Sequence, residues 1–122
     1  MSLLLEHVTA VTMDSAQPVL KDAFVAVEGT KISSVGTARP QGEFDRVIDG
    51  TGKVLMPGLV NAHTHVAMAL LRGYGGGHDL YHWLNDYIFP AEDKLDARCV
   101  AAGTALGLAE MIASGTTCIA DM

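Results

Sequence analysis

The sequence predicts an α/β protein in which a small β module precedes the first strands and helices of a parallel α/β fold. Three observations predict this class. Residues 1–56 alternate strand-type segments with turns, Pro57-Gly58 marks a change of character, and residues 57–122 follow the order strand, helices, strand. A right-handed crossover makes the two strands of such a unit parallel. Because a complete α/β fold needs several more strands, we expect these 122 residues to be the N-terminal part of a longer protein.

Composition indicates a globular chain and excludes several kinds of partner. Hydrophobic residues make up 49% of the sequence and charged residues 18%, a balance that supports a buried core. The net charge of −6 and the lack of a Lys/Arg cluster exclude binding to a nucleic-acid backbone. No apolar run approaches the ~20 residues that span a bilayer, and the N-terminus lacks the pattern of a signal peptide. We expect a cytoplasmic protein without a membrane partner, with Cys99 and Cys118 as buried free thiols.

The first 56 residues read as short strands joined by turns. Apolar and β-branched residues predict strands at 3–13, 23–28, 31–36, 46–49 and 53–56. Turn residues separate most of them, and a looser polar segment covers residues 37–45. Because the strands at 23–28 and 31–36 are linked by a tight turn, we expect a small antiparallel sheet or half-sandwich.

After Pro57-Gly58 the pattern changes to that of a βαβ unit. Residues 59–63 and 116–121 are short continuous apolar strands, of the kind buried on both faces of a parallel sheet. Between them, residues 66–71 predict a helical turn or two, and the glycines of residues 73–77 predict a loop.

Two longer helices complete this part of the chain. The first is predicted from Asp79, a candidate N-cap, to Phe89, with Pro90 as its stop. The second is predicted over residues 97–114, with Asp96 as its cap and Gly115 as its stop. Its apolar stripe consists of Val100, Thr104, Leu108, Met111 and Ile112. Gly103 and Gly107 in the same helix predict close packing on a neighbouring element.

His63 and His65 are the candidate metal ligands. Side chains alternate along a strand, so both imidazoles are expected on one side, with Cα atoms roughly 6.6 Å apart. The pair ends a buried-type strand, and ligands of parallel α/β folds gather at the carboxyl ends of strands. Neutral imidazole is a good zinc ligand, but a catalytic zinc keeps about three protein ligands, so the pair makes half a site. The alternative is that both histidines form hydrogen bonds in a packed core.

The residues around this pair resemble a known family. Met56-Pro-Gly-Leu-Val-Asn-Ala-His-Thr-His65 is similar to the opening metal motif of the amidohydrolase superfamily. Further segments narrow the resemblance to the branch of S-adenosylhomocysteine/5′-methylthioadenosine deaminases and triazine chlorohydrolases; they are residues 70–74, 82–84, 88–92 and 109–122. The resemblance implies a (β/α)₈ TIM barrel beginning at residue 57, preceded by residues 1–56 as the N-terminal part of a composite β-sandwich.

The resemblance also implies roles for individual residues. His63 and His65 correspond to the first two ligands of one divalent metal ion, zinc by preference, with iron or manganese as alternatives. Glu92 matches a carboxylate that holds the ribose hydroxyls of the substrate, a task that suits an acceptor with two oxygens. Trp83 is a candidate apolar wall for the purine or its sugar, with a place in the helix core as the alternative. The remaining ligands and the acid/base residue lie beyond Met122, so no catalytic residue is expected within this chain.

Three other acidic or histidine residues are weighed against plainer interpretations. His78 and His82 have the i, i+4 spacing of a second metal site, but a solvated helix face is the favoured interpretation. Asp121 ends the last predicted strand and is a candidate hydrogen-bond partner for a metal ligand, without a motif that makes it a ligand.

The function that the resemblance implies is metal-dependent hydrolytic deamination of adenosine-type nucleosides, with release of ammonia. The substrates would be 5′-methylthioadenosine and S-adenosylhomocysteine, and a homo-oligomer is left open. Two alternatives stand beside it: another amidohydrolase, such as a guanine- or oxoguanine-type deaminase or a triazine chlorohydrolase, and an inactive fragment that serves only for packing or oligomerisation. On any of these, residues 1–122 alone are expected to be inactive.

Overall fold

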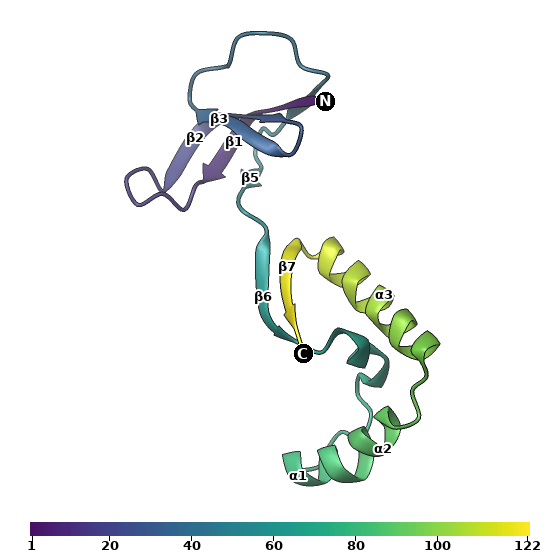
Figure 1. The fold of residues 1–122 in the computed structure, drawn as a ribbon. Helices are drawn as coiled ribbons and strands as arrows, with labels where there is room; N and C mark the ends of the chain where they lie inside the picture. The colour runs from purple at the N-terminus through teal and green to yellow at the C-terminus, as the bar shows by residue number, and fades with distance from the viewer. The chain divides into compact units, whose positions relative to one another are not determined.

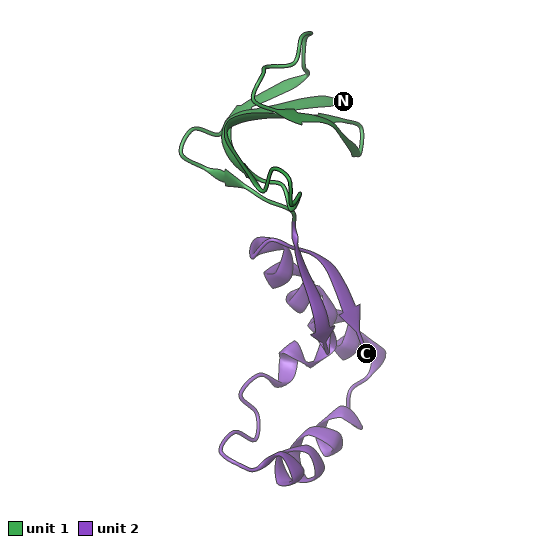
Figure 2. Cartoon of the chain, turned by 90° about the vertical axis from the view of Figure 1, so that its left-hand side faces the viewer, with its two compact units in different colours: residues 1–57 green, residues 58–122 purple.

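Two long strands, β1 (Ser2–Val11) and β2 (Val19–Glu28), organise the N-terminal part of the chain. The computed structural model describes residues 1–122 and divides them into two units, residues 1–57 and 58–122 (Figure 2). In the first unit, β2 pairs antiparallel with β1 on one side and with β3 (Lys31–Gly36) on the other (Figure 1). Gly29 has a φ of +60° in the turn between β2 and β3, which favours glycine there.

The expectation of an antiparallel sheet is wrong for the last two strands of this unit. β4 (Arg46–Asp49) and β5 (Val54–Leu55) both pair with β1 in parallel, so the strand order is β3-β2-β1-β4. The reason is the segment 37–45, which carries the chain from the end of β3 to the far side of β1 instead of turning it back. The result is a mixed sheet of five strands.

The pairing of β1 with β2 is interrupted by two register shifts. His7 and Asp22 lie at these shifts and have positive φ values of 60° and 51°. Their side chains form a hydrogen bond of 2.7 Å, and this bond raises the pKa of His7 above its ordinary value. His7 is exposed on the surface of the sheet.

The core of this unit lies around the middle of β1 and β2. Residues 23–26 of β2 are all buried, because both faces of the strand are covered at this point. One face packs Leu4 and Phe24 against Phe44, and the other packs Val8 and Val25 against neighbouring apolar side chains.

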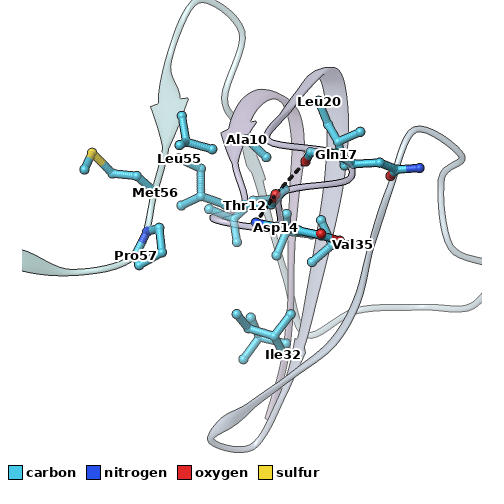
Figure 3. A pocket seen from close by; sticks show the side chains of 14 residues that line it. Ala10, Thr12, Asp14, Gln17, Leu20, Ile32, Val35, Leu55, Met56 and Pro57 are labelled. Atoms are coloured by element: carbon cyan, nitrogen blue, oxygen red, sulfur yellow. Dashed lines mark hydrogen bonds between the residues drawn. The ribbon is translucent and has the colours of Figure 1, made fainter.

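The second of these faces is concave. It borders a cavity of about 380 Å³, drawn in Figure 3, where Leu20, Ile32 and Leu55 are among the lining residues. At its polar edge, Thr12 donates a hydrogen bond to the Gln17 carbonyl. Ile32, exposed by 67%, leaves apolar surface open to solvent beside the cavity.

The second unit is built on two parallel strands, as predicted. β6 (Leu59–Thr64) pairs with β7 (Thr116–Asp121), and a 3₁₀ helix, η1 (Val66–Leu71), follows β6 directly. The predicted burial of these strands is wrong for residues 1–122, because Val60 of β6 is 68% exposed and Cys118 of β7 is exposed as well. Two paired strands with one helix packed beside them leave apolar side chains in contact with solvent.

The predicted helix after the glycine loop is present but is longer than expected. It consists of α1 (Leu80–His82), a π-helical segment η2 (Trp83–Ile88) and α2 (Phe89–Glu92). Asp79 is its N-cap, as predicted, and accepts hydrogen bonds from the amides of residues 81 and 82. Pro90 does not stop the helix, because it lies in the first turn of α2, where proline's missing N–H is tolerated.

The last helix, α3 (Ala97–Ala113), confirms its predicted cap and its glycine contacts but not its apolar stripe. The Asp96 carboxylate accepts a hydrogen bond of 2.8 Å from the Cys99 amide, and this contact lowers the Asp96 pKa. Ile112 of the predicted stripe is 74% exposed, whereas Gly103 and Gly107 are buried against η1. The contact face of α3 is thus its small-residue face. No helix of the structure has both the length and the apolar content needed to cross a bilayer.

Candidate metal centre

The carboxyl end of β6 positions the first candidate ligand, His63. Between Asn61 and Thr64 the strand advances by three residues while β7 advances by two, so β6 contains one extra residue at this point. A β-bulge of this kind re-aims side chains at the end of a strand. The Asn61 side-chain oxygen accepts a hydrogen bond of 3.3 Å from the His63 amide and so satisfies a donor near the bulge.

His65 lies just beyond the strand, at the N-cap position of η1, with φ −125° and ψ 78°. The rings of His63 and His65 meet edge to face, with centroids 5.2 Å apart and an interplanar angle of 80°. Both residues are exposed rather than packed in a core. The expectation that the two imidazoles lie on one side is therefore correct.

The histidine pair fits half of a zinc site. Two rings at this separation are compatible with one ion at the Zn–N distance of about 2.0–2.1 Å. Within residues 1–122 no group of three or more His, Cys, Asp or Glu side chains converges, so the pair has no third ligand here.

A cavity of about 580 Å³ adjoins His65. Its lining comes from the end of β6, η1 and α3 and includes His65, Arg72 and Glu110. Arg72 donates two hydrogen bonds to the Glu110 carboxylate, of 3.1 and 2.5 Å, and so joins the end of η1 to α3. These hydrogen bonds lower the pKa of Glu110 and raise that of Arg72.

We expect the Glu110 pair to make the unfolding of this protein sensitive to acid. Because the pKa of Glu110 is depressed in the folded state, the stability it contributes is present above its ordinary pKa of 4.5 and is lost as the pH falls through the folded value. In Glu110→Gln, the melting temperature should fall less steeply with decreasing pH than in the wild type. Thermal melts over a pH series test this, and equal slopes for both proteins would contradict it.

The two candidate substrate-binding residues come from the helical segment between β6 and α3. Trp83 is half-buried in η2, and its indole N–H donates to the Tyr74 carbonyl at 3.0 Å. Glu92 is half-buried at the end of α2 and takes part in none of the chain's ion pairs. Figures 1 and 2 both show this helical segment beyond the carboxyl ends of β6 and β7, the end that carries the histidine pair.

His78 and His82 do not form a second metal site. His82 bonds to the Asp79 carboxylate at 2.5 Å, and this bond lowers the Asp79 pKa. His78 instead stacks on Tyr87, with centroids 4.6 Å apart. The structure thus agrees with the favoured interpretation of a solvated surface and adds a specific partner for each ring.

Two structural residues near the site were missed by the sequence analysis. The Asn61 side chain accepts a hydrogen bond from the His63 amide at the bulge, and Arg72 connects η1 to α3 through its hydrogen bonds to Glu110. Asn two residues before a candidate ligand is a usable signal, because its side chain readily bonds a nearby backbone amide. The partner of Arg72 is 38 residues away, and no local pattern identifies it.

Comparison with known proteins places this arrangement in a family. A model of the amidohydrolase family matches residues 54–122, the larger part of the chain. The chain belongs to the amidohydrolase family. The match begins at β5 and includes both histidines of the candidate metal centre.

Among curated relatives, the chain is 44% identical over 122 residues to a 5-methylthioadenosine/S-adenosylhomocysteine deaminase of Thermoanaerobacter pseudethanolicus. It is 50% identical over 98 residues, 80% of its length, to a 5′-deoxyadenosine deaminase of Methanothermobacter thermautotrophicus. The chain spans 28% of the length of the first relative and 23% of the second.

Solved structures agree with this family assignment. An adenosine deaminase from Xanthomonas campestris with bound zinc superimposes with a TM-score of 0.91 at 38% identity, over 98% of this chain and 28% of that one. An atrazine chlorohydrolase from Arthrobacter aurescens in complex with zinc gives a TM-score of 0.88 at 26% identity, with the same coverage.

Proposed function

We propose that this amidohydrolase chain is the N-terminal part of a metal-dependent deaminase of adenosine-type nucleosides. The observation that carries the proposal is its 44% identity, over its whole length, to a 5-methylthioadenosine/S-adenosylhomocysteine deaminase. The identity to a 5′-deoxyadenosine deaminase supports the same substrate class. The whole protein would replace the ring amino group of such a nucleoside with oxygen from water and release ammonia.

In this proposal the two units take the architecture that the family resemblance implies. Residues 57–122 form the first βα unit of a (β/α)₈ barrel, and residues 1–56 form part of a composite β-sandwich. The parallel pairing of β6 with β7 and the packing of α3 beside them support the first assignment. The open apolar cavity on the sheet of the first unit supports the second, because a sandwich needs a second layer on that face.

We assign the metal to the histidine pair. His63 and His65 would hold one divalent ion, and the zinc named for two similar structures makes zinc the first candidate. The chemistry that such an ion supplies when bound is activation of water for attack on a polarised ring carbon. The part of this chain is to keep the two rings together at the carboxyl end of β6.

Glu92 and Trp83 are proposed to bind the nucleoside. A carboxylate can accept hydrogen bonds from both ribose hydroxyls at once, and Glu92 has no ion-pair partner that competes for it. The Trp83 ring would provide an apolar wall, with its N–H already satisfied by the Tyr74 carbonyl. Both assignments rest on the placement of their helical segment beyond the ends of β6 and β7 (Figure 1).

The substrate class is tested by an ammonia-release assay on the full-length protein loaded with zinc, iron or manganese. We expect turnover of 5′-methylthioadenosine, S-adenosylhomocysteine or 5′-deoxyadenosine, and no release from guanine or from chlorinated triazines. The similarity to a chlorohydrolase structure makes atrazine a necessary member of the panel. Release of chloride from triazines alone, or no turnover with any of the three metals, would contradict the proposal.

Glu92→Ala tests the ribose contact separately. We expect KM for the nucleosides to rise by about 10–100-fold, as is typical when a hydrogen-bonding charge is removed, while the metal content stays unchanged. Asp93→Ala is the matched control, because Asp93 is the exposed acid next in the chain. Equal effects of the two substitutions would contradict the assignment of Glu92.

A further inference from the structure

Residues at the end of β7 form hydrogen bonds with three consecutive residues, 64–66, and the middle one is the candidate ligand His65. The Met122 amide donates a hydrogen bond of 3.2 Å to the Thr64 carbonyl. The Asp121 Oδ1 atom accepts a hydrogen bond of 2.9 Å from the Val66 amide. Between these two contacts, Nδ1 of His65 lies 3.3 Å from the Met122 carbonyl oxygen. The end of β7 therefore contacts the residue before His65, the residue after it, and the His65 ring itself.

These contacts are needed to orient His65, because β6 itself does not fix this residue. The regular strand ends at Thr64, and His65 adopts the irregular backbone angles of an N-cap without a side-chain cap of its own. The Val66 amide is one of the first donors of η1, which have no partner within the helix. Asp121 supplies that missing acceptor from a different strand, across 55 residues of sequence.

The ring contact decides which nitrogen of His65 is available. When Nδ1 carries the proton, it donates to the Met122 carbonyl and leaves the Nε2 lone pair free for a metal. The same orientation keeps the ring edge to face with His63, at 5.2 Å between centroids. The Val66 amide, which donates to Asp121, belongs to the peptide that follows the Cα atom of His65. A shift of this peptide would therefore move the His65 ring and disturb its contacts with the Met122 carbonyl and with His63.

We propose that Asp121 is a positioning residue that sets the metal affinity of the site by fixing the His65–Val66 peptide. The inference rests on the proposed metal site at His63 and His65. It assigns Asp121 no contact with the ion, since its Oδ1 atom is engaged by the Val66 amide and no third ligand joins the histidine pair within this chain. The required property of Asp121 is an acceptor oxygen at this position, not a negative charge.

Asp121→Ala and Asp121→Asn separate these requirements in the full-length protein. Zinc affinity is measured by competition with a chelating indicator, and the melting temperature of the metal-free protein is measured alongside. We expect Asp121→Ala to bind zinc about 10–100-fold more weakly, the range found when residues that orient ligands are removed. Asp121→Asn keeps the acceptor oxygen and should restore affinity close to that of the wild type.

Asp96→Ala is the matched control. Asp96 also accepts a backbone amide, that of Cys99 at 2.8 Å, but at the start of α3. It should lower the melting temperature without changing zinc affinity, which separates positioning from general stability. Wild-type affinity in Asp121→Ala, or equal loss in Asp121→Asn and Asp121→Ala, would overturn this inference alone. A wild-type protein that binds no zinc would overturn the proposed metal site and this inference with it.

Discussion

Replacing Gly103 with alanine is expected to lower the free energy of unfolding by about 2 kcal/mol, the balance of overpacking and a gain in helix propensity. A Cβ atom at this position would lie 2.3 Å from the Ala67 carbonyl oxygen and 3.0 Å from Cγ of Leu70. The Ala67 carbonyl oxygen is a backbone atom that cannot rotate away, so α3 and η1 would have to separate. Overpacking of this severity costs about 3 kcal/mol, and alanine returns ~1 kcal/mol through its higher helix propensity.

The sign of this effect is what makes the experiment decisive. Helix propensity alone predicts that Gly103→Ala stabilises the protein, whereas the η1 contact predicts the opposite. Gly107→Ala should destabilise less, because its Cβ would lie 2.8 Å from Val66 Cγ1 and 3.0 Å from the Val66 carbonyl oxygen, farther than the 2.3 Å backbone contact at Gly103. Urea unfolding of the full-length protein measures both variants. Ala102→Gly, at an exposed position of α3, measures the difference in helix propensity between alanine and glycine without a packing contact.

A loss at Gly103 would also affect the metal site through η1. The two glycines allow η1 to lie directly on α3, and η1 begins at the residue after His65. A displaced η1 would move the Val66 amide relative to Asp121. We therefore expect Gly103→Ala to weaken zinc binding in the same direction as Asp121→Ala, in spite of its distance along the sequence.

The features that could be predicted from sequence are those whose signals are local. Asp79 and Asp96 are N-caps because a carboxylate can bond amides two or three residues later, and both contacts are present. The parallel pair β6 and β7 follows from strand-type segments on either side of a helical stretch. The closeness of the His63 and His65 rings agrees with their spacing, but the bulge and the N-cap angles of His65 set their geometry.

The features that could not be predicted depend on contacts between distant residues. Whether β4 pairs in parallel with β1 depends on the path of residues 37–45, which carry no regular pattern. The buried face of α3 was misassigned because apolar periodicity favours large residues, while the η1 contact selects glycine. The alternation of side chains along a strand also does not predict the bulge at His63. The bulge arises because β6 has one more residue than β7 between two paired positions.

Loss of either histidine of the candidate metal centre is expected to remove the metal from the full-length protein. In His63→Ala and His65→Ala, bound zinc should fall to background, and the proposed deaminase activity should fall by more than 100-fold. Substitutions that merely disturb the orientation of a ligand cost about 10–100-fold, and the removal of a ligand should cost more. Elemental analysis of the purified proteins measures the metal, and ammonia release measures the activity.

His82→Ala is the matched control for these variants. His82 is an exposed histidine of the same unit, but its ring is bonded to Asp79 and not to the histidine pair. It should retain full zinc content, so that a loss in the other variants is not a general effect of removing an imidazole. Zinc retained at wild-type level in both His63→Ala and His65→Ala would show that the ion is held elsewhere. Because each single substitution is expected to bring bound zinc to background, the double variant should lose no more metal than either single variant.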